Sequence, residues 1–211
     1  MIVDLRGHVP ASLAGIARHA YGLVLAESGL TAVPDDVGAA GDLRMLDVAH
    51  NQLTAVPAGV AELTALEVLY LGDNRFGEVP AVVRSLRSLV YLSVAENEIA
   101  QLPAWIGELE QLVELRVQHN GLTELPPSIG RLRALRELHL RGNTIRRLPV
   151  ETGQLTELRV LDLRANGTPD LPRALLDLPR LDKLDLRWNP YPELPAVAAA
   201  LRERGCFVLW P

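Results

Sequence analysis

Residues 112–132 read LVELRVQHNGLTELPPSIGRL, and almost the whole chain is built from copies of this stretch. The apolar skeleton recurs every 23 residues, and seven copies carry an asparagine at the place of Asn120. An eighth copy near the N-terminus has Ser28 there, and all eight copies have a proline six residues later. Such a fixed period indicates a repeat architecture in which each unit packs against its neighbours. The asparagine ladder consists of Asn51, Asn74, Asn97, Asn120, Asn143, Asn166 and Asn189.

One repeat predicts one coil of chain. Leu115 and Val117 alternate with polar residues, which is the two-residue period of a short strand with one buried face. The chain must then turn, and Pro126 starts a short helical or extended segment that carries Ile129 and Leu132 back to the interior. A single coil buries too little apolar surface to be stable alone, so the coils must stack. The buried asparagine amide is expected to bond the backbone of the bend in its own and the adjacent coil.

The pattern LxxLxxLxLxxNxLxxLPxxIGxL, read in full over residues 109–132, resembles the leucine-rich repeat of the 23-residue class with LPxxI in its second half. The resemblance covers residues 21–201. It implies an α/β fold, a right-handed solenoid or horseshoe with a parallel β-sheet on its concave face and short helical or extended convex segments. Similar repeats occur in intracellular scaffolds that contact Ras-type GTPases and in bacterial proteins, including secreted effectors. The partner implied is therefore another protein, a small GTPase or a host protein.

Length and composition restrict the class of protein. The 211 residues favour one solenoid, with an N-terminal cap at 1–20, eight repeats at 21–201 and a capping strand at 202–211. The net charge of −5 gives no reason to expect nucleic acid as a partner. No apolar run approaches the ~20 residues of a membrane span, and no signal-peptide pattern is present. Cys206 is the only cysteine, so a cytoplasmic location is expected, with secretion into a host cell as the alternative. Lys183 is the only lysine beside twenty arginines, which favours a GC-rich bacterial source over the alternative, selection against lysine modification.

Both ends depart from the repeat. A leading strand within residues 2–5 and a short amphipathic helix over residues 10–20 are expected to cap the array. That helix would place Leu13, Ile16 and Ala17 along one face.

At the other end, residues 198–200 predict a helix that replaces the LPxxI return, and residues 205–210 predict a last strand. Phe207 and Leu209 are expected to point inward in that strand, with Trp210 covering its edge. Four residues inside the array are interpreted as tolerated irregularities of the core, namely Thr152, Thr168, Pro190 and Tyr191.

No motif for catalysis is present, since the chain lacks a Gly-rich phosphate loop, a nucleophile elbow and paired cysteines. We therefore predict neither enzymatic activity nor a cofactor. His50 and His119 would lie about 14 Å apart if the strands are ~4.8 Å apart, which is too far to share a metal. His119 and His139 lie on adjacent coils but have no clear third ligand, so no metal site is predicted.

The residues that the repeat leaves free to vary on the concave strands are the candidates for binding. In the first half of the chain they are mostly small or apolar with two tyrosines, rimmed by Asp47, Asp73 and Glu96. In the second half they include a ladder of arginines beside a tryptophan. The candidate protein-binding residues are Tyr70, Tyr91, Arg116, His139, Arg141, Arg164, Arg187 and Trp188.

Two interpretations of the arginine ladder remain open. In the first, Asp162 and Asp185 pair with Arg164 and Arg187, and these pairs stabilise the sheet by about 0.2–1 kcal/mol each. In the second, the less fully paired side chains form an anchor patch, because arginine and aromatic residues dominate binding hot spots. The members of that patch are Arg116, His139, Arg141 and Trp188.

The tyrosines of the first half form a second candidate. Tyr70, Tyr91 and Met45 stand beside small residues that leave room for a side chain of a partner. The alternative is that the rings only cover strand edges. The small residues are Ala49, Gly72 and Ala95.

Three functions are weighed. The leading hypothesis is a non-enzymatic interaction module or scaffold, because a preorganised sheet of about nine strands, roughly 38 Å long, loses little entropy on binding a protein. The second is the substrate-recognition part of a bacterial effector or multi-domain enzyme. The third is a self-associating structural protein, although a monomer is favoured over an oligomer.

Overall fold

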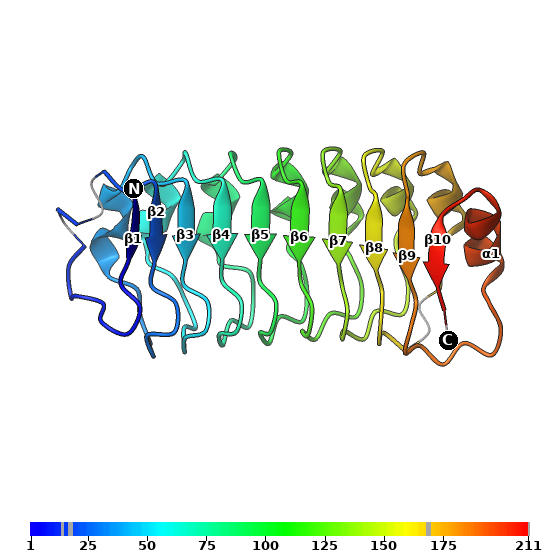
Figure 1. Ribbon diagram of the computed structural model, residues 1–211, viewed down its shortest axis with the longest axis horizontal. Helices are drawn as coiled ribbons and strands as arrows, with labels where there is room; N and C mark the ends of the chain where they lie inside the picture. Colours follow the sequence, from blue (N-terminus) through cyan, green and yellow to red (C-terminus); the bar gives the residue numbers. More distant parts are fainter. Residues whose placement is uncertain (14, 17–18, 168–169, 211) are drawn as a thin grey trace.

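The computed structural model describes residues 1–13, 15–16, 19–167 and 170–210. In these residues ten parallel strands form one sheet, and each strand pairs with its neighbours in sequence order. Figure 1 shows the strands in a single row, with the short helices behind them. The predicted solenoid is thus confirmed. The strands are β1 (Ile2–Asp4), β2 (Gly22–Val24), β3 (Met45–Asp47), β4 (Val68–Tyr70), β5 (Tyr91–Ser93), β6 (Glu114–Arg116), β7 (Glu137–His139), β8 (Val160–Asp162), β9 (Lys183–Asp185) and β10 (Phe207–Leu209).

The strands stack in register, so each position of the repeat forms a column along the sheet. Leu115 of β6 lies opposite Leu138 of β7, and both are fully buried. The first and third residues of each strand point away from the core because side chains alternate along a strand. We call this side the open face. It also carries the residue two before each asparagine, here called the post-strand column.

The return of each coil is a short helix that begins directly after the repeat proline. In the central coil, Pro126 precedes a 3₁₀ helix, because proline needs no N–H partner at a helix start. Gly130 lets neighbouring helices approach closely, since an added Cβ would lie 2.5 Å from the Glu151 carbonyl oxygen. The helices are η1 (Asp35–Ala39), η2 (Ala58–Glu62), η3 (Ala81–Ser85), η4 (Ala104–Glu108), η5 (Pro127–Arg131), η6 (Val150–Gln154), η7 (Arg173–Asp177) and the α-helix α1 (Ala196–Glu203).

The asparagine ladder joins the coils at the bend after each strand. Asn143 Nδ2 donates to the carbonyls of Leu140 and Val117 at 2.9 Å, and its Oδ1 accepts the Leu122 N–H at 3.0 Å. Leu140 belongs to the same coil as Asn143, whereas Val117 and Leu122 belong to the coil before it. The amide therefore bonds its own and the adjacent coil, as the sequence predicted.

The residue before each ladder asparagine, and before Ser28 in the first repeat, has a left-handed backbone. Its φ is positive in seven coils that carry a side chain there, and Gly142 takes this place in another. Trp188, with φ +62°, is the bulkiest of them, and a large side chain in this conformation is strained. The side-chain-bearing members are Glu27, His50, Asp73, Glu96, His119, Ala165 and Trp188.

The N-terminal strand is confirmed as β1, but the helix predicted over residues 10–20 is wrong. The described residues of that segment form turns and bends, and Gly15 has a φ of +86°, which ends any right-handed helix there. Leu13 is buried as expected, whereas Ile16 is exposed. Ala17 lies outside the described residues.

At the C-terminus the helix is confirmed as α1, but the expected inward pair of the last strand is wrong. Val208 lies opposite Leu184, so Phe207 and Leu209 flank it on the open face, and Phe207 is 62% exposed. The α-helical return needs one residue more than the 23-residue repeat, which shifts the register by one position. Thr152 is fully buried, and Thr168 lies outside the described residues.

No helix in the described part of the chain combines the length and apolar character that crossing a lipid bilayer requires.

Candidate functional site

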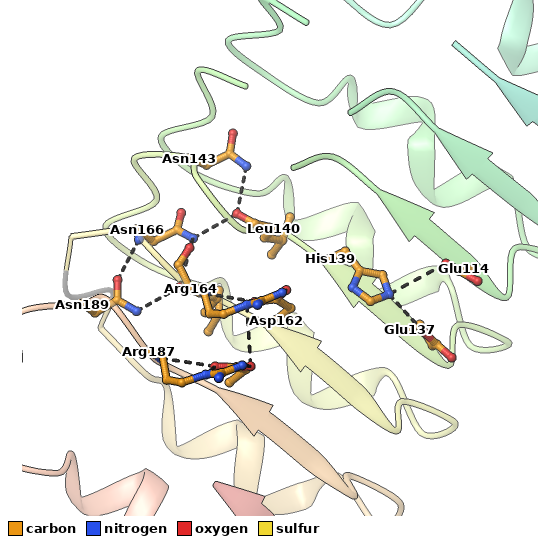
Figure 2. A network of polar contacts seen from close by, with 12 residues as sticks. Glu114, Glu137, His139, Leu140, Asn143, Asp162, Arg164, Asn166, Arg187 and Asn189 are labelled. Atoms are coloured by element: carbon orange, nitrogen blue, oxygen red, sulfur yellow. Dashed lines mark hydrogen bonds and ion pairs between the residues drawn. The ribbon is translucent and has the colours of Figure 1, made fainter. Parts of the chain in front are cut away.

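The arginines of β8 and β9 are paired within the sheet. Arg164 Nη2 lies 2.6 Å from the Asp162 carboxylate (Figure 2). Arg187 Nη2 lies 2.7 Å from the Asp185 carboxylate, and both carboxylates are buried. Burial raises the pKa of Asp162, but hydrogen bonds from Arg164 outweigh this effect and hold the pKa below its ordinary value. Residues two apart on a strand share a face, which brings each pair together. For Arg164 and Arg187 the first interpretation of the ladder therefore applies, in which each arginine pairs with an aspartate of the sheet.

Arg116 and His139 are also paired, contrary to the prediction. Arg116 forms an ion pair with Glu114. His139 Nε2 lies 3.0 Å from Glu137 and 3.8 Å from Glu114 (Figure 2). Glu114 and Glu137 occupy the first position of their strands, two residues before Arg116 and His139. Glu114 and Glu137 were missed in the sequence because only the third strand position and the post-strand column were compared. The two-residue spacing that places each glutamate beside its partner is nevertheless visible in the sequence.

Glu114, Glu137 and His139 offer three metal-ligating atoms within 4.8 Å of one another. The two glutamates are thus possible further metal ligands beside His139, which were not identified from the sequence. The guanidinium of Arg116 already neutralises Glu114, and the imidazole lies against Glu137. These side chains therefore form a network of ion pairs. That this network binds no metal remains a prediction.

Arg141 differs from the other arginines of the ladder. It has no ion pair among the described residues, and its Nε is buried without a hydrogen-bond partner there. Its guanidinium carbon lies 4.6 Å from the ring centre of Trp188, which also has Arg164 and Arg187 within 6 Å. Trp188 is 58% exposed. The Trp188 ring thus makes cation–π contacts with three arginines. Of these, Arg141 alone lacks a carboxylate partner among the described residues.

The tyrosines lie together on β4 and β5. The ring centres of Tyr70 and Tyr91 are 4.8 Å apart, and burial raises the pKa of Tyr91. Beside Tyr70 lies a hollow of about 190 Å³. Its lining residues are Ala49, His50, Tyr70, Gly72, Asp73, Ser93, Ala95 and Glu96.

The two halves of the open face differ in how their charges are balanced. In the second half, all described arginines of the face except Arg141 have a carboxylate partner. In the first half, His50 lies 2.7 Å from Asp73, but Glu96 has no ion pair among the described residues. Asp47 is half-buried, and burial raises its pKa. Around Tyr70 the charge without an ion pair among the described residues is therefore acidic, whereas in the second half it is basic, at Arg141 and at Lys183 in the first position of β9.

A comparison with protein families matches residues 81–193 to the leucine-rich repeat region. No match is found among curated proteins.

Three solved structures show what the chain is similar to. The leucine-rich repeat domain of the Xanthomonas type III effector XopL is 30% identical with a TM-score of 0.83, over 100% of this chain and 76% of that one. A leucine-rich repeat protein of Leptospira interrogans is 25% identical with a TM-score of 0.78, over 100% of this chain. The chain spans 59% of the Leptospira protein.

The third structure is the ectodomain of the Arabidopsis thaliana receptor kinase GASSHO1/SCHENGEN3, in complex with CASPARIAN STRIP INTEGRITY FACTOR 2. It is 29% identical with a TM-score of 0.82, over 99% of this chain and 26% of that one.

Proposed function

Because the chain belongs to the leucine-rich repeat family, we propose that it is a non-enzymatic interaction module that binds a protein on the open face of its sheet. The observation that carries this proposal is the pair of Arg141 and Trp188. An exposed tryptophan holds a cation that has no carboxylate partner among the described residues. Tryptophan and arginine are the residue types most enriched among binding hot spots.

A carboxylate of the partner would complete the site. It would accept charge-assisted hydrogen bonds from the Arg141 guanidinium, while an apolar group of the partner covers the Trp188 ring. Because the ring already packs on three arginines, its side chain loses little freedom on binding. Arg116 and His139, which are paired with glutamates, contribute shape and polar contacts around this anchor.

The plant receptor supports this assignment by analogy, since it was solved as a complex with CASPARIAN STRIP INTEGRITY FACTOR 2. For this chain the partner classes are a small GTPase, for a cytoplasmic scaffold, and a host protein, for a secreted effector. The similarity to the repeat domain of the effector XopL favours the second candidate function, the recognition part of an effector or of a larger enzyme.

Self-association is a third candidate. β1 and β10 each have one free edge in the described sheet, and Ile2 and Phe207 on them are exposed. Free strand edges can pair with another copy. A mass in solution that stays monomeric with rising concentration favours the interaction module, and a growing mass favours self-association.

The test is affinity purification from lysate with the parent, Arg141→Ala and Trp188→Gly. Glycine suits the left-handed backbone at position 188, so this change removes the ring without adding strain. The matched control is Arg133→Ala, an exposed arginine in the turn before β7.

We expect a partner retained by the parent and by the control to be lost about tenfold or more in Arg141→Ala and Trp188→Gly. Equal retention by all four proteins would contradict binding at this anchor.

A further inference from the structure

We propose that the hollow beside Tyr70 receives a lysine or arginine side chain of the protein partner. The inference rests on the proposed binding function and names the chemistry of the partner at a second position. Tyr70 and Ser93 border the hollow from the third position of β4 and β5, and the post-strand column borders it with small side chains. The acidic residues Asp73 and Glu96 border it from the left-handed positions.

The hollow exists because the post-strand column changes character along the array. Its first members are Ala49, Gly72 and Ala95, whereas the equivalent positions from residue 118 onward carry glutamine or arginine. The open space is thus a property of these coils and not of the repeat.

The volume fits one side chain. At about 190 Å³ the hollow is smaller than the roughly 300–1,000 Å³ of pockets that hold drug-sized ligands. A single long side chain of a docked protein is an occupant of suitable size. Its apolar stem would contact Ala49 and Ala95, and its end would reach the polar border.

Charge selects a basic occupant. Glu96 has no ion pair in the described chain, and Asp73 contacts only the imidazole of His50. Asp47 lies opposite Tyr70 on the adjacent strand and is half-buried without an ion pair among the described residues. His50 also lines the hollow, and its imidazole already offsets Asp73, so the lining carboxylate left for an incoming cation to compensate is Glu96, while Asp47 lies outside the lining. The cation could also stack on the Tyr70 ring. An acidic occupant would add repulsion, and an apolar one would leave Glu96 uncompensated.

The first test does not need the natural partner. The ¹⁵N-labelled full chain is titrated by NMR with N-acetyl-arginine methylamide, and the neutral probe is the citrulline analogue of equal size. We expect saturable shifts of the backbone amides of Gly72, Ser93 and Ala95 with the arginine probe, and much smaller ones with citrulline.

Two variants and a control define the site. Glu96→Gln should weaken binding of the arginine probe about threefold to tenfold, and Ala95→Leu, which fills the hollow, should abolish it. Glu98→Gln removes a nearby exposed carboxylate outside the hollow and should leave the affinity unchanged. Equal shifts with the citrulline probe, or an affinity unaffected by Glu96→Gln, would overturn the inference.

A second test separates this inference from the proposed function. A displayed library of random peptides is selected on the parent, and the selected peptides are tested on Glu96→Gln and Trp188→Gly. Peptides rich in lysine or arginine that lose affinity for Glu96→Gln support the inference. Peptides that lose affinity only for Trp188→Gly and show no preference for basic residues overturn the inference and leave the binding function standing. A library without any binder counts against both.

Discussion

Replacing Asn143 by alanine tests what the asparagine ladder contributes to stability. Asn143 is 5% exposed and makes three hydrogen bonds with the backbone. Two of the freed groups keep a partner, because the Val117 carbonyl also accepts from Asn120 and the Leu140 carbonyl also accepts from Asn166. The Leu122 N–H keeps none among the contacts of the described chain. The variant therefore leaves one buried donor unsatisfied, which costs about 1–3 kcal/mol.

The expected loss of about 2 kcal/mol corresponds to a fall in Tm of about 4–8 °C for a chain of this size. The matched variant is Asn120→Ala, which frees the Ile99 N–H at a partly exposed site and should cost less. Hydrogen exchange gives a local measurement, because the Leu122 amide should lose protection in Asn143→Ala. A melt within 1 °C of the parent, using ~1 °C as the precision of the assay, or a larger loss in Asn120→Ala, would refute the reasoning.

Three further predictions follow from single contacts. Thr152→Val should raise stability by about 1 kcal/mol in a thermal melt, because the Thr152 hydroxyl is buried without a hydrogen-bond partner in the described chain; a lower Tm would contradict this. Gly130→Ala should cost about 1–3 kcal/mol, since its Cβ would meet the Glu151 carbonyl, whereas the control Gly77→Ala has no atom within 4 Å and should be nearly neutral in the same melt. The hydrogen bond to Asp73 raises the pKa of His50, so the pair stabilises the fold below the unfolded-state pKa of about 6.5, and this contribution is lost as pH rises through the higher folded-state pKa. An NMR titration should show the His50 pKa falling in Asp73→Asn, and an unchanged value would contradict the assignment.

Much of the fold follows from the sequence because the repeat places the same residue at the same point of every coil. Leu115 and its equivalents predict the buried strand position, and Pro126 predicts where the return begins. Asn143 predicts the bridge between coils, since its short amide carries both donors and an acceptor. Each of these residue types suits one position of a stacked coil, namely the buried strand position, the start of the return helix or the bend between coils. Periodicity therefore carries almost all the information about the core.

The ends were predicted less well because no neighbouring copy fixes them. The segment around Gly15 has no repeat pattern, and its apolar spacing is typical of a helix although the positive φ of Gly15 interrupts one. In the last coil, α1 replaces a 3₁₀ return and shifts the register, so that Val208 takes the inward position expected for its neighbours. A single residue of difference in the return reverses which side chains face the core.

The candidate site was only partly visible in the sequence. Arg116 was expected to be less fully paired than Arg164 and Arg187, but its partner Glu114 lies two residues earlier on the same strand. The two-residue spacing in the sequence already indicates this pair. The cation–π contact of Arg141 with Trp188 spans three coils and depends on the left-handed backbone at position 188. The hollow beside Tyr70 matches the room expected from the small residues, and Asp73 and Glu96 border it as the sequence predicted. The left-handed backbone of these two residues was not predicted.

The residues that hold the coils together differ from those that we propose for recognition, and Trp188 bears on both stability and the proposed recognition. The leucines and asparagines that hold the coils together point inward or along the bend, so the open face can vary without loss of the core. At position 188, however, a bulky ring adopts a strained left-handed backbone that glycine would adopt freely. Contacts with arginines on three coils offset part of this strain. A residue that costs backbone strain and remains 58% exposed gains little from folding alone, which is why we place the anchor for a partner there.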